Sequence, residues 1–149
     1  MTLEQLTQAI LDTHHRYLHE HMPSLDRALV EAHAPIELMR PWRDLLYTMG
    51  DHMQKEEVIL FPALKALSRG EPELWVEGPM AAMEMAHMDI RDIEAALRSV
   101  ADLAGPNRAH LIELLDDLSE HARIEDEELF AGARQTIGEM STGRKAYAL

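Results

Sequence analysis

Apolar residues recur at steps of three and four along almost the whole of this 149-residue chain, and no segment alternates apolar and polar residues as a strand does. Such spacing places apolar side chains on one face of a helix, so the pattern predicts an all-α protein. Proline and glycine interrupt it at Ala34–Pro35, between Ser68 and Pro79, and at Gly105–Pro106. The predicted helices lie near residues 3–33, 36–67, 79–104 and 107–137.

The connections at the first and last breaks are short, so the two helices that each one joins must run antiparallel. The predicted fold is an antiparallel, up-down-up-down four-helix bundle. The length suits one domain, which we place at residues 1–139, followed by a flexible C-terminal tail at residues 140–149. Pro23 and Pro62 lie inside predicted helices, and each predicts a kink or a short interruption.

Two segments of the chain resemble each other. HMQKEEVILFPALK, which begins at His52, aligns without gaps with HARIEDEELFAGAR, which begins at His121. Glu56 aligns with Glu125. In each segment the histidine and the glutamate are four residues apart, so an imidazole and a carboxylate share one helix face. Each half of the predicted bundle therefore carries the same H-x-x-x-E motif.

Both motifs lie on the apolar faces of their helices. The predicted face of the second helix comprises Trp42, Leu45, Met49, His52, Glu56, Ile59 and Ala63. That of the fourth comprises Leu111, Leu114, Leu118, His121, Glu125 and Glu128. An ionised glutamate among leucines loses several kcal/mol of hydration unless another group compensates it, and a shared cation would compensate both. Without a cation, we expect the two carboxylates to repel each other and at least one to bind a proton.

Hairpin geometry predicts which other histidines join these motifs, because residues equidistant from the turn lie at the same level. The midpoint between His15 and His52 falls at the Ala34–Pro35 break. His33 fails this test, since it lies roughly 27 Å from His15 along a straight helix at about 1.5 Å per residue. It is predicted at the far end of the bundle. Spacing alone does not choose between His15 and the neighbouring His14.

In the second hairpin, the midpoint between His87 and His121 falls beside Gly105. His87 also continues the apolar face of the third helix, which comprises Met80, Met83, Ile90 and Leu97. One histidine from each helix should thus reach the middle of the core. The chain has no cysteine, which excludes disulfides, thiolate zinc sites, iron–sulfur clusters and cysteine nucleophiles.

Four imidazoles and two carboxylates in a bundle core suit iron or manganese better than structural zinc, which closes with four ligands. Two histidines and two bridging carboxylates per ion would leave coordination positions open. Open positions permit chemistry on small molecules.

The chain resembles the hemerythrin-like (HHE cation-binding) family in HHRYLHEHMPSL, VEAH, HMQKEEVILFP, GPMAAMEMAH and HARIEDEELF, which occur in the family's order. It is most similar to the di-iron repair-of-iron-centres proteins, without the cysteine-containing N-terminal domain that many of them carry. The resemblance implies two non-haem iron ions, either oxo- or hydroxo-bridged. The implied metal ligands are His15, His52, Glu56, His87, His121 and Glu125, with the two glutamates as bridges.

The resemblance also favours His15 over His14. Oxygen-carrying hemerythrins have a further histidine one turn from the ligand of their third helix, where this chain has Met83 and Arg91. A simple oxygen carrier is therefore disfavoured.

The implied function is to bind or reduce a small oxidant, with nitric oxide ahead of dioxygen and peroxide, in nitrosative or oxidative stress response or iron-centre repair. Turnover would need an unidentified electron donor. Two alternatives stay open: a non-catalytic module that stores or senses O₂, NO or iron, and a metal that only braces the core. Spacing does not separate turnover from binding, so enzyme activity is left undecided.

The net charge of −13, with only 14 Lys and Arg, argues against nucleic acid and anionic membranes as partners. No stretch approaches the roughly 20 apolar residues of a membrane span, and the N-terminus lacks a basic start. We therefore expect a cytoplasmic monomer or homodimer.

Other conspicuous residues have ordinary interpretations. Glu57 is predicted to be a solvated neighbour of Glu56, with support of the metal site as the alternative. The residues predicted to be exposed or at the boundary of the core are His14, His19, His21 and His110. The residues predicted to be flexible core filler are Met80, Met83, Met85 and Met88.

Overall fold

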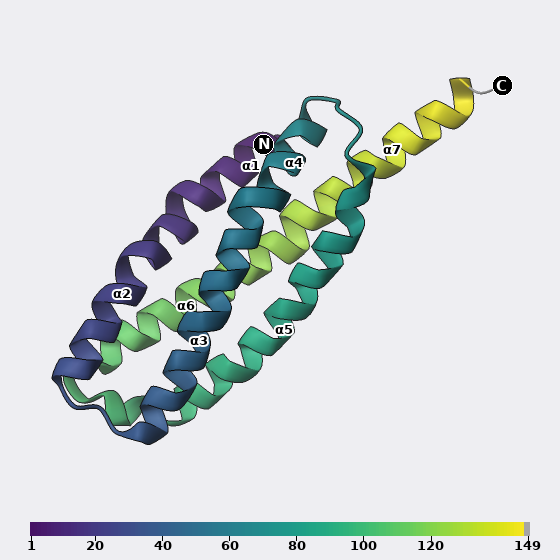
Figure 1. Ribbon diagram of the computed structural model, residues 1–149. Coiled ribbons are helices and arrows are strands. Elements are labelled where there is room, and N and C mark those ends of the chain that lie inside the picture. The colour runs from purple at the N-terminus through teal and green to yellow at the C-terminus, as the bar shows by residue number, and fades with distance from the viewer. Residues whose placement is uncertain (148–149) are drawn as a thin grey trace.

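The computed structural model describes residues 1–147, and this part of the chain folds into four long helical segments (Figure 1). The first consists of α1 (Leu3–Ile10), the π-helical turn η1 (Leu11–His15) and α2 (Arg16–Glu31). Thr2 and Gln5 begin it with a capping box. The Thr2 hydroxyl accepts from the Gln5 backbone N–H at 3.1 Å, and the Gln5 side chain accepts from the Thr2 N–H at 2.9 Å.

The first segment ends in a Schellman motif whose left-handed residue is His33, with φ 53°. The His33 N–H donates to the Val30 carbonyl at 3.0 Å, and the Ala34 N–H donates to the Leu29 carbonyl at 3.1 Å. His33 is exposed in the turn between α2 and α3. Its predicted place at the far end of the bundle is confirmed.

The second segment consists of α3 (Ile36–Lys55), the π-helical turn η2 (Glu56–Leu60) and α4 (Phe61–Ser68). Pro62 lies in the first turn of α4, where its missing N–H is tolerated best, directly after η2. The interruption predicted near Pro62 is therefore present. By contrast, α2 continues through Pro23 without a break in the helix.

The second half of the chain contains η3 (Leu74–Val76), α5 (Glu77–Ser99), η4 (Ala101–Asn107), α6 (Arg108–Ile124), η5 (Glu125–Phe130) and α7 (Ala131–Tyr147). Gly105 turns the chain inside η4 with φ 55°, a conformation that glycine adopts without strain.

The last helix is longer than predicted. The sequence predicts its end near residue 137, but α7 continues to Tyr147 because helical hydrogen bonding passes Gly138. The last two residues of the predicted tail, 148–149, lie outside the described residues.

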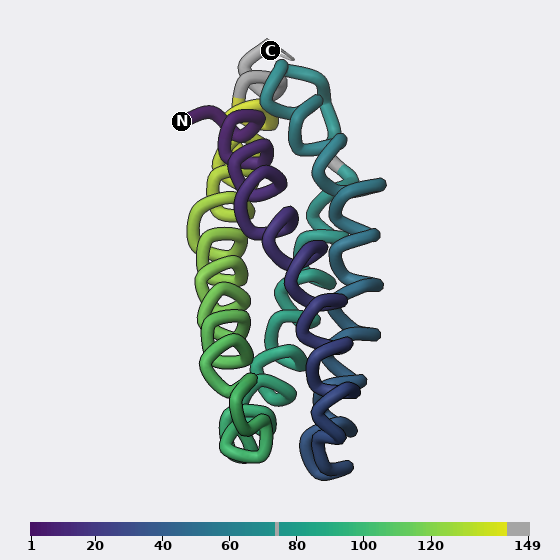
Figure 2. Tube along the Cα trace, turned by 90° about the vertical axis from the view of Figure 1, so that its left-hand side faces the viewer, coloured from purple at the N-terminus to yellow at the C-terminus, as the bar shows by residue number. Residues whose placement is uncertain are grey.

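The helical segments run antiparallel in sequence order, which is the predicted up-down-up-down bundle (Figures 1 and 2). Contacts between α1 and α4, α3 and α5, α5 and α6, and α2 and α6 close the ring. In residues 1–147, no helix is both long enough and apolar enough to cross a membrane.

Two apolar clusters fill the bundle, one toward each end. The cluster near the α2–α3 and α5–α6 turns includes Leu25, Trp42 and Leu114. The other includes Leu64 and Phe130 and lies toward α1, α4 and α7. A layer of buried histidines and glutamates lies between the two clusters.

Candidate metal centre

Three of the four helical segments loosen into a π-helical turn at the level of this polar layer. Turn η1 ends at His15, η2 begins at Glu56 and η5 begins at Glu125. A π turn inserts one extra residue, so it changes which side chains face the core, and such turns are frequent at functional sites. The third segment supplies His87 from the regular helix α5.

The π turns correct two of the predicted core positions. Ile59 is 52% exposed, and Glu128 has a side chain that is 50% exposed. In their places Leu60 and Leu129 are buried. The extra residue of each π turn moves the core face by one position directly after the H-x-x-x-E motif. The predicted spacing therefore fails directly after each glutamate, although Ala63, also predicted on this face, is buried.

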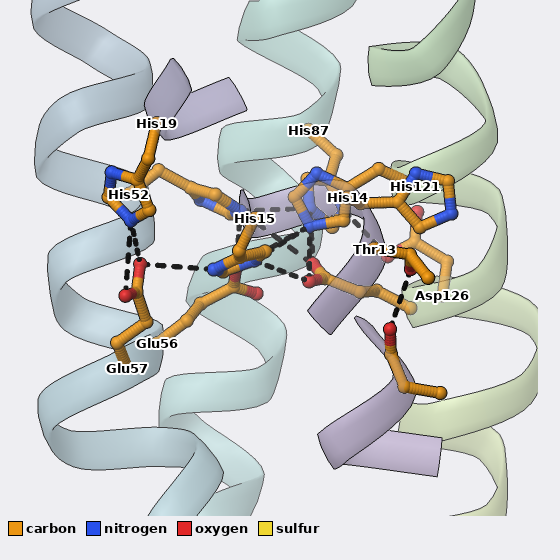
Figure 3. Close-up of polar contacts among 12 residues, drawn as sticks. Thr13, His14, His15, His19, His52, Glu56, Glu57, His87, His121 and Asp126 are labelled. Atoms are coloured by element: carbon orange, nitrogen blue, oxygen red, sulfur yellow. Dashed lines mark hydrogen bonds and ion pairs between the residues drawn. The ribbon is translucent and has the colours of Figure 1, made fainter. Parts of the chain in front are cut away.

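Six side chains converge in the middle of the bundle (Figure 3). Each helical segment contributes one histidine, and the second and fourth segments each contribute one glutamate. All six are at most 2% exposed. They are His15, His52, Glu56, His87, His121 and Glu125.

The imidazole Nε2 atoms point toward a common centre and meet in pairs. Nε2 of His15 lies 3.1 Å from Nε2 of His121, and the same distance separates Nε2 of His52 and Nε2 of His87. The carboxylates lie between these pairs. Carboxylate Oε1 of Glu56, for example, lies 3.2 Å from His15 and 3.3 Å from His52.

Among the described residues, these side chains form two groups whose donor atoms all lie within 4.8 Å of one another. One group is His15, Glu56, His121 and Glu125, and the other is His52, Glu56, His87 and Glu125. Both glutamates belong to both groups. This is the arrangement in which two carboxylates can each bridge two cations.

The buried polar atoms of the centre fit bound cations. Both carboxylate oxygens of Glu56, Oε1 of Glu125 and Nδ1 of His52 are buried without a hydrogen-bond partner. Imidazole nitrogens lie at ion-pair distance from Oε1 of both glutamates, but outside hydrogen-bond geometry. Unsatisfied buried carboxylate oxygens are costly in a protein core. A cation between them would satisfy them, and nitrogen and oxygen donors suit a transition metal.

Residues 6–133 match the hemerythrin HHE cation binding domain, which is most of the chain. The chain belongs to the hemerythrin HHE cation-binding family. The family expectation from sequence is therefore confirmed, and so is the four-helix bundle.

Curated relatives of this family member include three proteins named iron-sulfur cluster repair protein YtfE. The protein of Edwardsiella ictaluri is 28% identical over 88% of this chain and 66% of its own length. The protein of Citrobacter koseri is 29% identical over 87% of this chain and 58% of its own length. The protein of Enterobacter sp. (strain 638) is 33% identical over 55% of this chain and 40% of its own length. The chain thus spans less than two thirds of each relative.

The carboxylates hold positive charge on the histidines of this hemerythrin-family centre. Burial opposes a charge on each imidazole, yet nearby carboxylates, with Glu125 acting on all four, outweigh burial. The pKa rises to about 10 for His15 and His87 and to about 9 for His121, and that of His52 is also raised. Without a metal, the carboxylates favour protons on these imidazoles.

Glu125 is not the carboxyl group that binds the proton expected from the sequence. Burial would raise the pKa of its carboxyl group, but the charge and hydrogen bond of His121, and the nearby imidazoles of His15 and His52, lower this pKa well below its ordinary value. The carboxylate of Glu125 therefore stays ionised without a metal. The protons reside on the imidazoles, which the sequence argument had treated only as neutral ligands.

The residues beside the centre occupy distinct places. His14 points outward and bonds Asp117 at 2.9 Å, so His15, not His14, reaches the core. The Tyr17 hydroxyl donates to Glu113 at 3.2 Å, and Tyr47 is 82% exposed. Neither phenol reaches the centre.

The methionine prediction is half right. Met80 and Met83 are buried in the core, whereas Met85 and Met88 are 69% and 62% exposed. The two exposed methionines lie on the outer face of α5. They do not fall at the three-and-four steps that define the buried face of this helix.

Two acidic residues that follow Glu56 and Glu125 bond to histidines of the centre, and sequence reasoning did not predict these contacts. The Nδ1–H of His15 donates to Glu57 at 3.0 Å, and that of His87 donates to Asp126 at 2.7 Å (Figure 3). Glu57 is thus not simply solvated. The available signal was the second acidic residue in both copies of the repeat, E-E and E-D.

Proposed function

We propose that this chain is a di-iron protein in which His15 and His121 hold one iron and His52 and His87 hold the other, while Glu56 and Glu125 bridge them. The observation that carries the proposal is the pair of four-residue groups that share two glutamates with unsatisfied buried oxygens. Iron is favoured because membership of the hemerythrin family and the names of the relatives both point to it. Nitrogen and carboxylate donors without sulfur suit it as well.

The proposed activity is binding or reduction of a small oxidant, with nitric oxide ahead of dioxygen and peroxide, in the repair of iron centres or the response to nitrosative stress. Two ferrous ions would supply one electron each, so that two NO and two protons yield N₂O and water. The protein's part is to hold two ions side by side in a buried layer between two apolar clusters. Further turnover requires an electron donor from outside the chain.

A cavity beside the centre supports access by a small molecule. It has a volume of about 220 Å³ and lies between α5 and α6, with the ligand candidate His87 in its wall. Its lining is apolar at Ile90, Leu118 and Ala122, and charged groups come from Arg91, Glu94 and Arg98. A diatomic molecule fits such a space easily, whereas a large organic substrate does not.

The test is a single-turnover experiment with iron-loaded protein, reduced anaerobically and mixed with NO. Reduction predicts about one N₂O per di-iron centre, since two electrons are available. The rival binding module predicts reversible spectral changes without N₂O. Chelator-treated protein carried through the same steps is the control for chemistry of free iron. Loaded protein that neither binds NO nor forms N₂O would exclude both functions.

We expect Ala95→Trp to slow NO binding several-fold without changing metal content. Ala95 is exposed and lines the outer part of the cavity, so a large ring there narrows access while leaving the core untouched. Stopped-flow mixing with NO measures the effect. The matched control is Ala96→Trp, because Ala96 is exposed on the same helix but outside the cavity lining. Equal rates in both variants would show that small molecules reach the centre by another route.

A further inference from the structure

The two halves of the bundle repeat more than the H-x-x-x-E motif. In each half the bridging glutamate is followed by an acidic residue and, four residues after that, by phenylalanine: Glu57 and Phe61 in one copy, Asp126 and Phe130 in the other. Both additional residues contact a histidine of the preceding helical segment. Each copy of the repeat therefore contacts the histidine that comes from the other helical segment of its own hairpin.

The acidic residue bonds the outer nitrogen of that histidine. Glu57 accepts from Nδ1 of His15 at 3.0 Å, and Asp126 accepts from Nδ1 of His87 at 2.7 Å. Consecutive residues on a helix point about 100° apart. The first carboxylate of each pair can thus face the centre while the second faces the neighbouring helix.

The phenylalanine packs on the same histidine. The ring of Phe61 lies 5.3 Å from that of His15, and the ring of Phe130 lies parallel to that of His87 at 6.4 Å. Each of these imidazoles thus has a hydrogen bond at one nitrogen and a phenylalanine ring beside it. The bond and the packing together restrict its rotation.

We propose that Glu57 and Asp126 are positioning residues that set the tautomer and the orientation of His15 and His87 for metal binding, an inference that rests on the proposed metal centre. A carboxylate only accepts hydrogen bonds, so Nδ1 of each imidazole must carry the hydrogen. The lone pair of a neutral ring is then on Nε2, the atom that faces the centre. Carboxylate partners of this kind also make an imidazole a stronger donor to a metal.

The two candidate iron sites each receive one histidine held in this way. His15 belongs to one group and His87 to the other. Their companions differ, because Nδ1 of His52 is buried without a partner and the ring of His121 stacks on His14 at 5.8 Å. Each ion would therefore have one strongly oriented imidazole and one held mainly by packing.

The surroundings make the two carboxylates different. Glu57 also accepts from the exposed His19 at 2.9 Å. Asp126 instead lies 3.6 Å from Arg91, which keeps its charge at every pH that the protein tolerates. The second contact of Glu57 is thus a histidine and that of Asp126 is an arginine. Each carboxylate is therefore replaced separately in the experiment below.

The experiment compares Glu57→Gln and Asp126→Asn with the control Asp117→Asn in the full chain. Asp117 accepts from Nδ1 of His14 at 2.9 Å, the same kind of contact on a histidine outside the centre. All three changes remove one negative charge and keep the side-chain size. The probe is Co²⁺, with affinity measured by chelator competition and helix content by circular dichroism.

We expect each of the first two variants to weaken binding of one of two Co²⁺ ions by about tenfold or more. The Asp117→Asn variant should bind both ions as the wild type does. Proton NMR of the Co²⁺ form gives a second readout, since ring N–H protons of ligated histidines appear as shifted, exchangeable signals. The signal of the affected histidine should exchange faster with solvent or disappear in Glu57→Gln and Asp126→Asn.

Wild-type affinities together with unchanged exchangeable signals in both variants would overturn the positioning role. If Asp117→Asn weakens Co²⁺ binding equally, the loss of one negative charge explains the effect, and the positioning role is overturned as well. If a variant loses helix content, the signals and affinity of the other variant decide. Wild-type protein that binds neither iron nor Co²⁺ would instead contradict the proposed metal centre itself, so the two failures are distinguishable.

Discussion

Replacing either bridging glutamate should remove the paired metal centre. We expect about two iron ions per wild-type chain, and one or fewer, without the spectrum of coupled ions, in Glu56→Ala and Glu125→Ala. Each carboxylate lies in both groups of donor atoms, so its loss removes a ligand from both ions at once. Metal analysis and visible spectroscopy after loading with ferrous iron measure the result.

The control for this prediction is His33→Gly, which should keep both ions. His33 lies in the exposed turn after α2 and holds a left-handed conformation that glycine adopts more easily. The glutamate variants should keep their helices, because the apolar clusters on both sides of the centre stay intact. Circular dichroism tests this separately. Full iron occupancy in both glutamate variants would show that the carboxylates are not ligands.

The bundle and the convergence of the six side chains could be predicted because both follow from spacing along regular helices. The predicted limits of 3–33 and 36–67 differ from the observed helical ends by one or two residues, since proline and the Schellman turn end these helices locally. Hairpin symmetry then placed His15 beside His52. That argument needs only equal rise per residue on α2 and α3, and both π turns lie on the far side of these histidines from the turn.

The π turns could not be predicted from the sequence. No residue type marks them, because they result from the packing of the whole layer, in which three segments admit one extra residue beside the centre. Their consequence is the exposure of Ile59 and Glu128, which a uniform helix would bury. The contacts of Glu57 and Asp126 were missed for a related reason, since they depend on the angle between neighbouring helices. The spacing of residues along one helix does not predict that angle.

The charge of the centre predicts opposite pH trends for the apo and metal-loaded proteins. The pKa of His15 and His87 is raised from an ordinary 6.5 to about 10, and that of His121 to about 9. A raised folded-state pKa contributes stability that is fully present below the unfolded value and is lost as pH rises through the folded value. Apo protein should therefore lose stability steadily between about pH 6.5 and pH 9.

Glu125 sets the acid limit of the same profile. Its pKa is held well below the ordinary 4.5, so its contribution is present above that value and is lost as pH falls further. Apo stability should be greatest between about pH 4.5 and 6.5. The sequence argument expected at least one of the two glutamates to bind a proton without a cation. The structure attributes the pH trend to imidazoles that lose their protons as the pH rises.

Metal binding should reverse the trend, because ions replace the protons and require neutral imidazoles. The loaded protein should keep its stability toward alkaline pH and lose metal on acidification. The difference in melting temperature between the loaded and apo forms should grow from about pH 5 to 8.5, on the order of 5 °C or more overall. Thermal melts followed by circular dichroism, with Co²⁺ or with chelator, measure both profiles.

A substitution at Glu125 tests whether the buried imidazoles, and not other titrating groups, cause the loss of stability at alkaline pH. In apo Glu125→Gln, the carboxylate that acts on all four histidines is absent, so their pKa values should fall and the alkaline loss of stability should shrink. Exposed ion pairs do not produce the same slope, since carboxylates, lysines and arginines keep their charges between pH 6.5 and 8.5. The matched Asp117→Asn variant should retain the wild-type slope, because Asp117 contacts His14 outside the centre. If apo wild type and apo Glu125→Gln show the same slope, the buried imidazoles do not carry the positive charge that a metal would replace.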